Sequence, residues 1–260
     1  MTKHYAVLGS PISHSKSPLI HREIFSLSGV DADYQAFELA EGLREWVLAL
    51  DQDWLGLSLT MPLKKQALDL ALRADPVAIA AQAANTLVRV GEGWDAYNTD
   101  VFGINQTLKG QKFSAVCVLG TGATARSAIV AMLETGKRVS VWGRDPKKLN
   151  ALAAEFEIEP LTSLGVALSQ PAVISTLVAG AIDDQLSKDF SGILLDAIYH
   201  PWPTELAKRF PGQKVFSGFD MLIWQAIGQQ RLFQNQDLDT PLKNERELVS
   251  AVYQALSVAK

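Results

Sequence analysis

One stretch, residues 116–126, constrains the fold of this chain more than any other, because a glycine-rich turn there joins an apolar run to an alanine-rich run. The apolar run predicts a short buried strand, and the alanine-rich run predicts the start of a helix. In a dinucleotide-binding unit, Gly120 permits the sharp turn, Gly122 lets backbone N–H groups approach a diphosphate, and Ala125 permits close packing of helix and strand. The diphosphate lies at the positive end of the helix dipole. A tight turn without a ligand is the alternative.

The residues after the turn favour the dinucleotide-binding interpretation. Gly136 can end the helix, and residues 138–142 predict a second strand, which completes the order strand, turn, helix, strand. Gly143 stands where a carboxylate for the NAD ribose is expected, whereas the cations that follow suit the 2′-phosphate of NADP. NADP is therefore favoured over NAD. The candidate cofactor-binding residues of this region are Gly120, Gly122, Ala123, Thr124, Ala125, Arg144 and Lys148.

The charged segment after the second strand has a structural interpretation as well. Asp145 and Pro146 are typical of a helix N-cap and first turn. Both interpretations hold together if Asp145 caps the helix while its basic neighbours bind the cofactor. The negative charge of Asp145 nevertheless weakens the preference for NADP, and Asp145 is the alternative ligand for the ribose of NAD.

Composition excludes several other classes of protein. The chain has 260 residues, enough for one large or two small domains, and its 48% hydrophobic and 20% charged residues are ordinary for a globular protein. A net charge of −4 argues against a nucleic-acid partner held by a broad basic face. Cys117 is the only cysteine, so no intramolecular disulfide can form, which fits a reducing cytosol. We find no signal-peptide pattern and no apolar run of membrane-spanning length, and we expect a cytoplasmic protein without a membrane partner.

Hydrophobic periodicity predicts alternating strands and helices in two α/β layers. The expected strands are residues 5–9, 55–60, 116–119, 138–142, 172–176, 192–197 and 215–216, with a hairpin of 85–90 and 93–98. The expected helices are residues 19–27, 39–50, 64–72, 99–109, 123–135, 146–156, 221–233 and 244–259. Ligands of such sheets bind beyond the carboxyl ends of parallel strands. Polar residues follow the predicted strand ends at 10–17, 60–64, 98–100 and 199.

Several spaced segments resemble the shikimate dehydrogenase family. Residues 9–18 (GSPISHSKSP) are similar to its N-terminal signature, and residues 58–64 (SLTMPLK) resemble its N-V-T-x-P-x-K segment. The two N-T elements have counterparts at Asn85-Thr86 and Asn98-Thr99, and the resemblance continues through 196–199 to 218–225. It therefore covers nearly the whole chain, in the order of the family.

The resemblance implies an α/β fold with two domains. The N-terminal substrate-binding domain, with a mixed sheet, is expected at 1–100 and is completed by 219–260. A Rossmann-type NADP-binding domain is expected at 101–218. The C-terminal helices then return to the first domain, because Gln225 is implied in the substrate site beside residues of the first hundred positions.

The resemblance also implies the reaction, the reversible NADP-dependent reduction of 3-dehydroshikimate to shikimate in aromatic amino-acid (chorismate) biosynthesis. Lys64 and Asp100 are implied to flank the reacting hydroxyl as catalytic residues, and Gly218 is implied at the cofactor. The implied substrate-binding residues are Ser15, Ser17, Thr60, Asn85, Tyr199 and Gln225. The chemistry is reasonable, because oxidation of an alcohol requires removal of its hydroxyl proton and the reverse step requires a donor. A solvated helix start at Lys64 and a helix cap at Asp100 are the structural alternatives.

Other functions stay open. Within the class, the chain could be a quinate/shikimate dehydrogenase that uses NAD. From another class, it could be a non-catalytic dinucleotide-binding sensor, although retention of both Lys64 and Asp100 argues against that. No pair of histidines has the spacing of metal ligands, so we expect no metal. The chain is expected to be a monomer or a homodimer.

The sequence departs from the family pattern at a few positions. Ser58 replaces an asparagine, and Gly143 and Asp145 replace the asparagine and threonine around the cofactor arginine. The N-A-T segment of the cofactor domain becomes Ser-Thr-Leu at 175–177, and a glycine of the tail becomes Asp220. These changes concern cofactor affinity more than the reacting centre.

Overall fold

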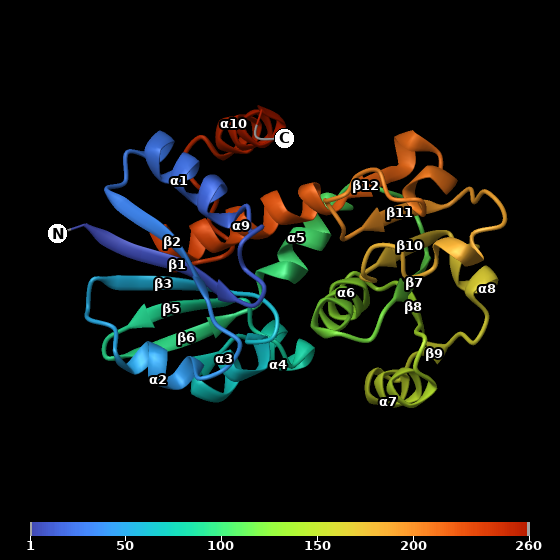
Figure 1. The fold of residues 1–260 in the computed structure, drawn as a ribbon, viewed down its shortest axis with the longest axis horizontal. Coiled ribbons are helices and arrows are strands. Elements are labelled where there is room, and N and C mark those ends of the chain that lie inside the picture. Colours follow the sequence, from blue (N-terminus) through green and yellow to red (C-terminus); the bar gives the residue numbers. More distant parts are fainter. Residues whose placement is uncertain (1, 259–260) are drawn as a thin grey trace. The chain divides into compact units, whose positions relative to one another are not determined.

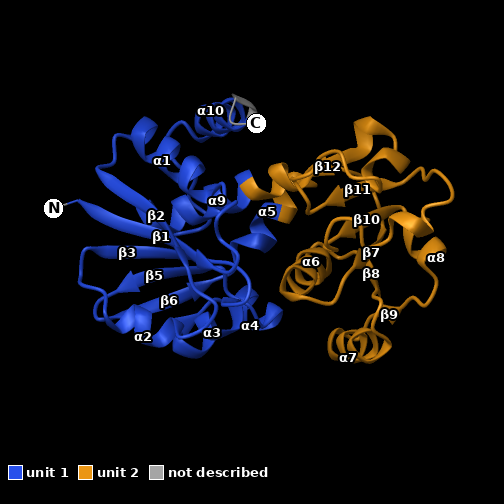
Figure 2. Ribbon diagram, viewed as in Figure 1, with its two compact units in different colours: residues 1–103, 223–260 blue, residues 104–222 orange. Residues whose placement is uncertain are grey.

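The computed structural model describes residues 2–258 and divides into two compact units (Figures 1 and 2). Unit 1 contains residues 1–103 and 223–260, and unit 2 contains residues 104–222. The chain passes from one unit to the other within helix α5 (Thr99–Thr107) and returns within helix α9 (Gly218–Asn235). The assignment of these two regions as a substrate domain and a cofactor domain stays a prediction.

The sheet of unit 1 is mixed and has six strands in the order β2-β1-β3-β5-β6-β4. β1 is parallel to β2 and β3, whereas β5 is antiparallel to both β3 and β6. The strands are β1 (Lys3–Gly9), β2 (Ala32–Glu38), β3 (Trp54–Leu59), β4 (Arg73–Ala74), β5 (Thr86–Val90) and β6 (Gly93–Tyr97). The hairpin of β5 and β6 was predicted and is confirmed.

Helices cover both faces of this sheet. Figure 1 shows α1, α9 and α10 on one face and α2, α3 and α4 on the other. The helices are α1 (Ser17–Ser28), α2 (Leu43–Leu48), α3 (Lys64–Leu70), α4 (Pro76–Ala81) and α10 (Glu245–Val258). Because α10 packs against α1, the predicted return of the C-terminal helices to the first domain is confirmed.

The core of unit 1 follows from the alternation of side chains along its strands. Ala6 and Leu8 of β1 point into a core with the buried residues of α2, α3 and α4. Tyr5 and Val7 point to the other face, where they pack in one cluster with Phe233 of α9. Gly56 of β3 lies under that ring, and a Cβ there would approach Phe233 to 2.4 Å.

The sheet of unit 2 has six strands in the order β12-β11-β10-β7-β8-β9, and every pair is parallel. This is the strand order of a doubly wound dinucleotide-binding sheet, whose topological switch point lies between β7 and β10. The strands are β7 (Ala115–Leu119), β8 (Arg138–Trp142), β9 (Glu159–Pro160), β10 (Ala172–Ser175), β11 (Ile193–Asp196) and β12 (Val215–Ser217). The predicted two-unit α/β fold class is confirmed.

The longer helices of unit 2 follow β7 and β8. Figure 1 shows α6 and α8 on opposite faces of the sheet. The helices are α6 (Ala123–Glu134), α7 (Pro146–Phe156) and α8 (Leu164–Leu168), with short 3₁₀ turns η1 (Asp183–Gln185), η2 (Ala207–Arg209) and η3 (Gly212–Lys214). Gly136 has φ +69° and ends α6, as expected.

Two expectations for the first hundred residues were wrong. The helix expected at 39–50 is only α2, which begins at Leu43 after Gly42 with φ +78°. The strand β2 was not predicted, because its sequence ADYQAFE contains three polar or charged residues and buries only Tyr34 fully. Pairing with β1, seven residues in register, places it in the sheet despite this weak pattern.

Candidate active site

Strand directions bring polar residues of unit 1 to one edge of its sheet. β1 and β3 are parallel, and β6 runs in the same direction because β5 is antiparallel to both β3 and β6. Thr60 therefore follows β3, Asn98 follows β6, and Asn85 precedes β5 at the same edge. Gly9 ends β1 there, and a Cβ on it would meet Thr60 Cγ2 at 2.2 Å. This edge was the predicted place for the substrate.

An ion pair between Lys64 and Asp100 lies at this edge. Lys64 is the first residue of α3, and its Nζ lies 2.5 Å from Asp100 Oδ2 in the first turn of α5. The two side chains are only 13% and 6% exposed. Low exposure argues against a solvated helix start at Lys64. The helix-cap alternative for Asp100 is disfavoured because Asn98 Oδ1 accepts from the N–H of Asp100 at 3.1 Å.

Asn85 supports the same carboxylate from the other side. Its Nδ2 donates to Asp100 Oδ1 at 2.8 Å and to Gln225 Oε1 of α9 at 3.2 Å. Its Oδ1 accepts from the backbone N–H of Thr99 at 2.8 Å. Since a backbone N–H can only donate, the orientation of the Asn85 amide is fixed. We refer to Lys64, Asn85, Thr99, Asp100 and Gln225 as the substrate cluster.

Two predicted residues lie in the loop and helix after β1. Ser17 begins α1 and is buried, whereas Ser15 is half-buried in the loop before it. Ser15 Oγ accepts from the backbone N–H of Ser17 at 3.3 Å. The other end of this loop is held by Glu38, whose carboxylate accepts from Ser10 Oγ at 2.5 Å and from the N–H of Ile12 at 2.8 Å. Those hydrogen bonds lower the pKa of Glu38.

A second buried polar group lies next to the substrate cluster and was missed by the sequence analysis. Gln229 of α9 donates to the backbone oxygen of Asn85 at 3.0 Å and to Thr86 Oγ1 at 3.1 Å. It also contacts His21 and Ser58. The sequence could have indicated Gln229, because Gln225 and Gln229 are one helical turn apart and so share one face of α9.

In unit 2 the glycine turn after β7 has the geometry that a diphosphate requires. Gly120 has φ +122°, a conformation that favours glycine, and a Cβ on it would approach Thr176 Oγ1 to 2.3 Å. Thr176 follows β10, so the turn lies at the topological switch point. Gly122 precedes α6 in extended backbone, and a Cβ there would meet nothing within 4 Å. The space beside Gly122 at the start of α6 is therefore open.

The predicted charge pattern after β8 is also present. Asp145 caps α7, since its Oδ1 accepts from the N–H of Lys147 at 2.9 Å and of Lys148 at 3.2 Å. Arg144 and Lys148 are exposed, and neither side chain forms an ion pair with another residue in the range 2–258. Capping thus engages the Asp145 carboxylate and leaves two cations available. We call Gly120–Ala125 together with Arg144 and Lys148 the cofactor turn.

Two further predicted residues lie in unit 2. Tyr199 is half-buried after β11 and packs on Phe219, with ring centroids 5.1 Å apart. Burial raises the pKa of its hydroxyl, which therefore stays protonated at neutral pH. Gly218 begins α9 where the backbone of Ala197 passes close by, and a Cβ on it would approach Ala197 O to 2.2 Å. Only glycine fits there without movement of the backbone.

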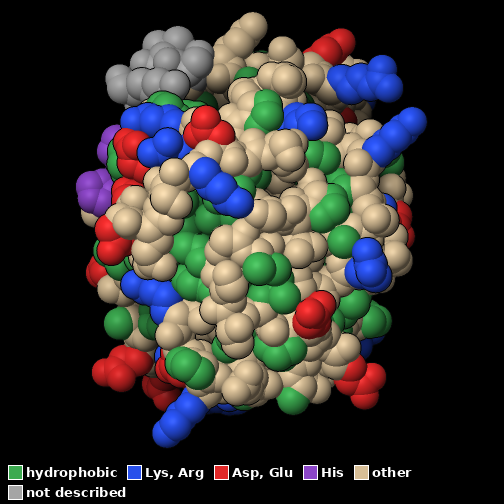
Figure 3. Space-filling model, turned by 90° about the vertical axis from the view of Figure 1, so that its right-hand side faces the viewer, with side chains coloured by type: hydrophobic (Ala, Val, Ile, Leu, Met, Phe, Trp, Pro, Cys, Tyr) green, Lys and Arg blue, Asp and Glu red, His purple; other side chains and the backbone are tan. Residues whose placement is uncertain are grey.

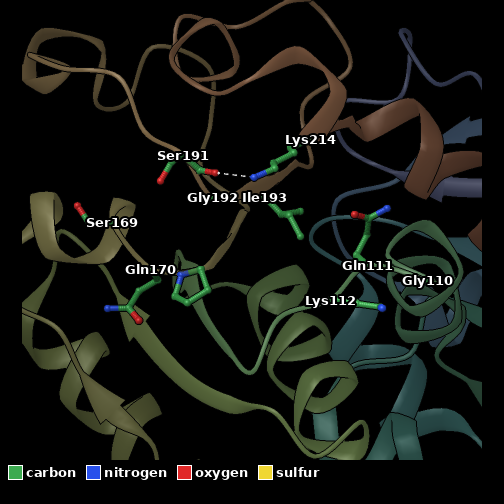
Figure 4. A pocket seen from close by; sticks show the side chains of 10 residues that line it. Gly110, Gln111, Lys112, Ser169, Gln170, Ser191, Gly192, Ile193 and Lys214 are labelled. Atoms are coloured by element: carbon green, nitrogen blue, oxygen red, sulfur yellow. Dashed lines mark hydrogen bonds between the residues drawn. The ribbon is translucent and has the colours of Figure 1, made fainter.

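A cavity of about 580 Å³ in unit 2 is separate from the cofactor turn (Figure 4). Its lining residues precede or begin the parallel strands β7, β10, β11 and β12, so the cavity lies at their amino ends. Lys214 points across it, and its Nζ donates to Ser191 O at 3.1 Å. The glycine turn follows the carboxyl end of β7, at the opposite edge of the sheet.

The described residues contain neither a metal-binding cluster nor a membrane-spanning helix. Between residues 2 and 258, no three His, Cys, Asp or Glu residues gather closely enough to hold a metal ion. None of the helices described is both long and apolar enough to span a membrane. Figure 3 shows one face of the molecule, where basic side chains lie among acidic and hydrophobic ones.

Comparison with known proteins decides the family. Residues 7–87 match the family model of the shikimate dehydrogenase substrate binding domain. The NADP⁺-dependent shikimate dehydrogenase of Aquifex aeolicus is 31% identical over 245 residues, which cover 87% of this chain and 89% of the relative. The chain belongs to the shikimate dehydrogenase family. The resemblance inferred from the sequence motifs is thereby confirmed.

Solved structures of shikimate dehydrogenases have the same fold. The enzyme of Mycobacterium tuberculosis superimposes with a TM-score of 0.85 at 32% identity and covers 99% of this chain and 100% of its own. The enzyme of Thermus thermophilus, solved in complex with NADP(H) and shikimate, gives a TM-score of 0.83 at 28% identity and covers 98% and 100%. The likeness thus extends over both units.

Proposed function

We propose that this chain is an NADP-dependent shikimate dehydrogenase, which reversibly reduces 3-dehydroshikimate to shikimate in aromatic amino-acid biosynthesis. The observation that carries the proposal is the buried contact of Lys64 and Asp100, 2.5 Å apart, in a member of this family. Relatives along nearly the full chain are NADP⁺-dependent shikimate dehydrogenases, and one of them has been solved with both ligands.

Lys64 and Asp100 are assigned to the reacting hydroxyl. Oxidation of shikimate removes a hydride from carbon 3 and a proton from its hydroxyl, and bound NADP⁺ supplies the hydride acceptor. In this positioned pair the Lys64 ammonium donates a hydrogen bond to the hydroxyl oxygen, and the Asp100 carboxylate takes up the hydroxyl proton. In the reverse direction the same pair returns a proton to the ketone oxygen. The amide of Asn85, by donating to Asp100 Oδ1, keeps that carboxylate facing Lys64.

The remaining residues of the substrate site are assigned by the chemistry of shikimate, a ring with hydroxyls and one carboxylate. Asn85, Asp100 and Gln225 hydrogen-bond to ring hydroxyls. Their polar atoms already lie together, because Asn85 Nδ2 is 2.8 Å from Asp100 Oδ1 and 3.2 Å from Gln225 Oε1. The hydroxyls of Ser15 and Ser17 bind the carboxylate, and Thr60 lines the same end of the site. Tyr199 is assigned to the substrate by the family resemblance alone. These assignments follow the family resemblance residue by residue.

The cofactor turn is assigned to NADP. The diphosphate lies on the N–H groups of Gly122, Ala123, Thr124 and Ala125, where the open space beside Gly122 admits it. Arg144 and Lys148 bind the 2′-phosphate by charge-assisted hydrogen bonds. Gly218 is assigned to the cofactor by the family resemblance, and its missing side chain permits the close approach of the Ala197 backbone. Because Asp145 is engaged in capping α7, we assign no ribose contact to it.

Location and assembly are further parts of the proposal. Cys117 is the only cysteine of the sequence and is buried, so no intramolecular disulfide can form, which fits a reducing compartment. We therefore place the protein in the cytoplasm. We expect a monomer or homodimer, which light scattering on the purified protein would distinguish.

One assay tests the proposed function. Purified protein is mixed with shikimate or quinate, each with NADP⁺ or NAD⁺, and reduced nicotinamide is followed by absorbance. We expect the highest kcat/KM for shikimate with NADP⁺. Faster turnover of quinate with NAD⁺ would replace the proposal by a quinate/shikimate dehydrogenase. Binding of the dinucleotide without any turnover would identify a non-catalytic sensor.

A further inference from the structure

Gln229, on the same face of α9 as Gln225, connects the substrate cluster to a buried polar layer behind it. We propose that Gln229 is a positioning residue for the substrate site, which holds Asn85 and Thr86 so that the Asn85 amide donates to Asp100. The inference rests on the proposed function, because Asn85 and Asp100 are there assigned to the hydroxyls of shikimate. Gln229 itself has no assigned contact with substrate.

Every hydrogen-bonding position of the Gln229 amide is used. Its Nε2 donates to the backbone oxygen of Asn85 at 3.0 Å and to Thr86 Oγ1 at 3.1 Å. Its Oε1 accepts from Ser58 Oγ at 3.0 Å and from His21 Nε2 at 3.0 Å. The residue is only 1% exposed. A buried amide with all partners present has one orientation, because rotation would leave several of them unpaired.

The contact with Thr86 transmits this orientation to Asn85. The Thr86 hydroxyl oxygen accepts from the Gln229 N–H, so the hydroxyl proton cannot point toward Gln229. The Thr86 hydroxyl instead donates to Asn85 Oδ1 at 2.9 Å. The same Oδ1 accepts from Thr99 N, so both donors hold the oxygen end of the amide. The NH₂ end is thereby left to face Asp100 Oδ1 at 2.8 Å.

The other side of Gln229 is held by His21. His21 Nδ1 lies 2.8 Å from the Nε2 amide donor of Gln230, so the ring proton is on Nε2, where it donates to Gln229 Oε1. Burial lowers the pKa of His21 to about 3, which keeps the ring neutral and preserves this tautomer. The ring also stacks on Tyr34, with centroids 4.2 Å apart.

Ser58 completes the layer from β3. Its hydroxyl accepts from Tyr34 OH at 2.6 Å and donates to Gln229 Oε1. Burial raises the pKa of Tyr34, so its hydroxyl remains a donor. Ser58 is the position where the family segment has asparagine, and in this chain its hydroxyl belongs to the layer that supports Gln229. The departure at 58 and the glutamine at 229 therefore act together.

Gln230 provides a matched control. It is the next residue of α9, is fully buried, and also hydrogen-bonds to His21. Its Oε1 accepts from Gln234 Nε2 at 2.7 Å. Within the described chain its amide bonds to neither Asn85 nor Thr86. Replacing either glutamine by leucine thus removes one buried amide from His21. In Gln230→Leu the neutral ring keeps its proton on Nε2, because Gln229 Oε1 still accepts it there, so only Gln229→Leu removes the support of Asn85.

The test compares Gln229→Leu with Gln230→Leu in steady-state assays at a temperature where both are folded by circular dichroism. For Gln229→Leu we expect KM for shikimate to rise about 10-fold or more, the scale of one or two buried hydrogen bonds, while KM for NADP⁺ stays within about twofold. Gln230→Leu should keep all constants within about twofold of the unchanged protein. A purely structural role would lower the active fraction, and hence kcat, without changing either KM.

Thr86→Val is the second variant, because it removes the hydroxyl through which Gln229 reaches the Asn85 amide while preserving side-chain shape. Like Gln229→Leu, it should raise KM for shikimate. If Gln229→Leu does not fold, the KM of Thr86→Val alone tests the inference. Unchanged KM for shikimate in the folded variants, or equal effects of Gln229→Leu and Gln230→Leu, would overturn the inference. Absence of shikimate turnover by the unchanged protein would instead refute the proposed function, and this inference with it.

Discussion

In unit 1 the candidate site consists of buried side chains that hydrogen-bond to one another, whereas in unit 2 it consists of backbone N–H groups and exposed cations. Asn85 and Asp100 are almost fully buried and are held by neighbours from several elements. Gly122 and Arg144, in contrast, are exposed. A buried polar cluster must be satisfied internally, and this requirement fixes its geometry before substrate arrives.

The difference fits the two ligands. Hydroxyl groups in several directions require donors and acceptors at defined positions, so a change to one side chain should propagate to its neighbours. A diphosphate requires only N–H groups at a helix terminus, and a 2′-phosphate requires a nearby cation. We therefore expect changes in unit 1 to affect chemistry and shikimate, and changes in unit 2 to affect the dinucleotide alone.

The largest effect is expected from Lys64→Ala. Removing the ammonium leaves the buried Asp100 carboxylate without its ion pair, and it leaves the reacting oxygen without the hydrogen-bond donor that stabilises its developing negative charge. We expect kcat for shikimate oxidation to fall about 100-fold or more, with a much smaller change in KM. Lys65→Ala is the control, since Lys65 is the exposed next residue of α3 and should be neutral. A kcat near normal in Lys64→Ala would remove Lys64 from the mechanism.

A smaller effect, confined to the cofactor, is expected from Arg144→Ala. Loss of a charge-assisted hydrogen bond should weaken NADP⁺ binding about 10- to 100-fold, and NAD⁺ binding should hardly change. Titration calorimetry with each dinucleotide measures both affinities. Arg138→Ala serves as control, because Arg138 begins β8 and so lies at the opposite edge of the sheet. If the unchanged protein prefers NAD⁺, the assignment of Arg144 is wrong and Asp145 becomes the candidate ribose ligand.

The smallest effect is a pH dependence of stability that arises in unit 1. His21 has a folded pKa of about 3 against 6.5 in the unfolded chain, because burial disfavours the charged ring. The unfolded chain therefore binds a proton first, so the stability is fully present above about pH 6.5 and is lost as the pH falls toward 3. The loss approaches ~1.4 kcal/mol per pH unit within that window.

Urea unfolding at pH 7.5 and at pH 5 tests this expectation. Between these values the unchanged protein should lose about 2 kcal/mol more stability than His21→Leu. His14→Leu should behave like the unchanged protein, because His14 is exposed in the loop before α1. If stability depends equally on pH in His21→Leu and in the unchanged protein, His21 is not held neutral by burial in the folded chain.

Local sequence predicted the site features of unit 2 better than those of unit 1. The glycine turn, the helix that follows and the cap at Asp145 each depend on residues close in sequence, so spacing alone indicates them. The Lys64–Asp100 pair joins two segments, and only the family resemblance placed them together. The edge where they meet was predictable from strand ends, but the hydrogen bonds among Asn85, Thr99 and Gln225 depend on tertiary structure.

Two omissions have the same physical origin. β2 has a weak alternating pattern and exists because it pairs with β1. Gln229 looks like an ordinary helix residue in the sequence, and its contacts with Asn85 and His21 come from elements far away along the chain. Buried polar residues of this kind are recognised only when their partners are known.

We expect this chain to transfer a hydride from carbon 3 of shikimate to NADP⁺. The most direct measurement uses shikimate deuterated at carbon 3, incubated with the protein and NADP⁺, with mass spectrometry of both products. We expect 3-dehydroshikimate without the label and one deuterium on the reduced nicotinamide for each molecule oxidised. Unlabelled reduced cofactor, release of the deuterium to water, or no oxidation at all would contradict the account.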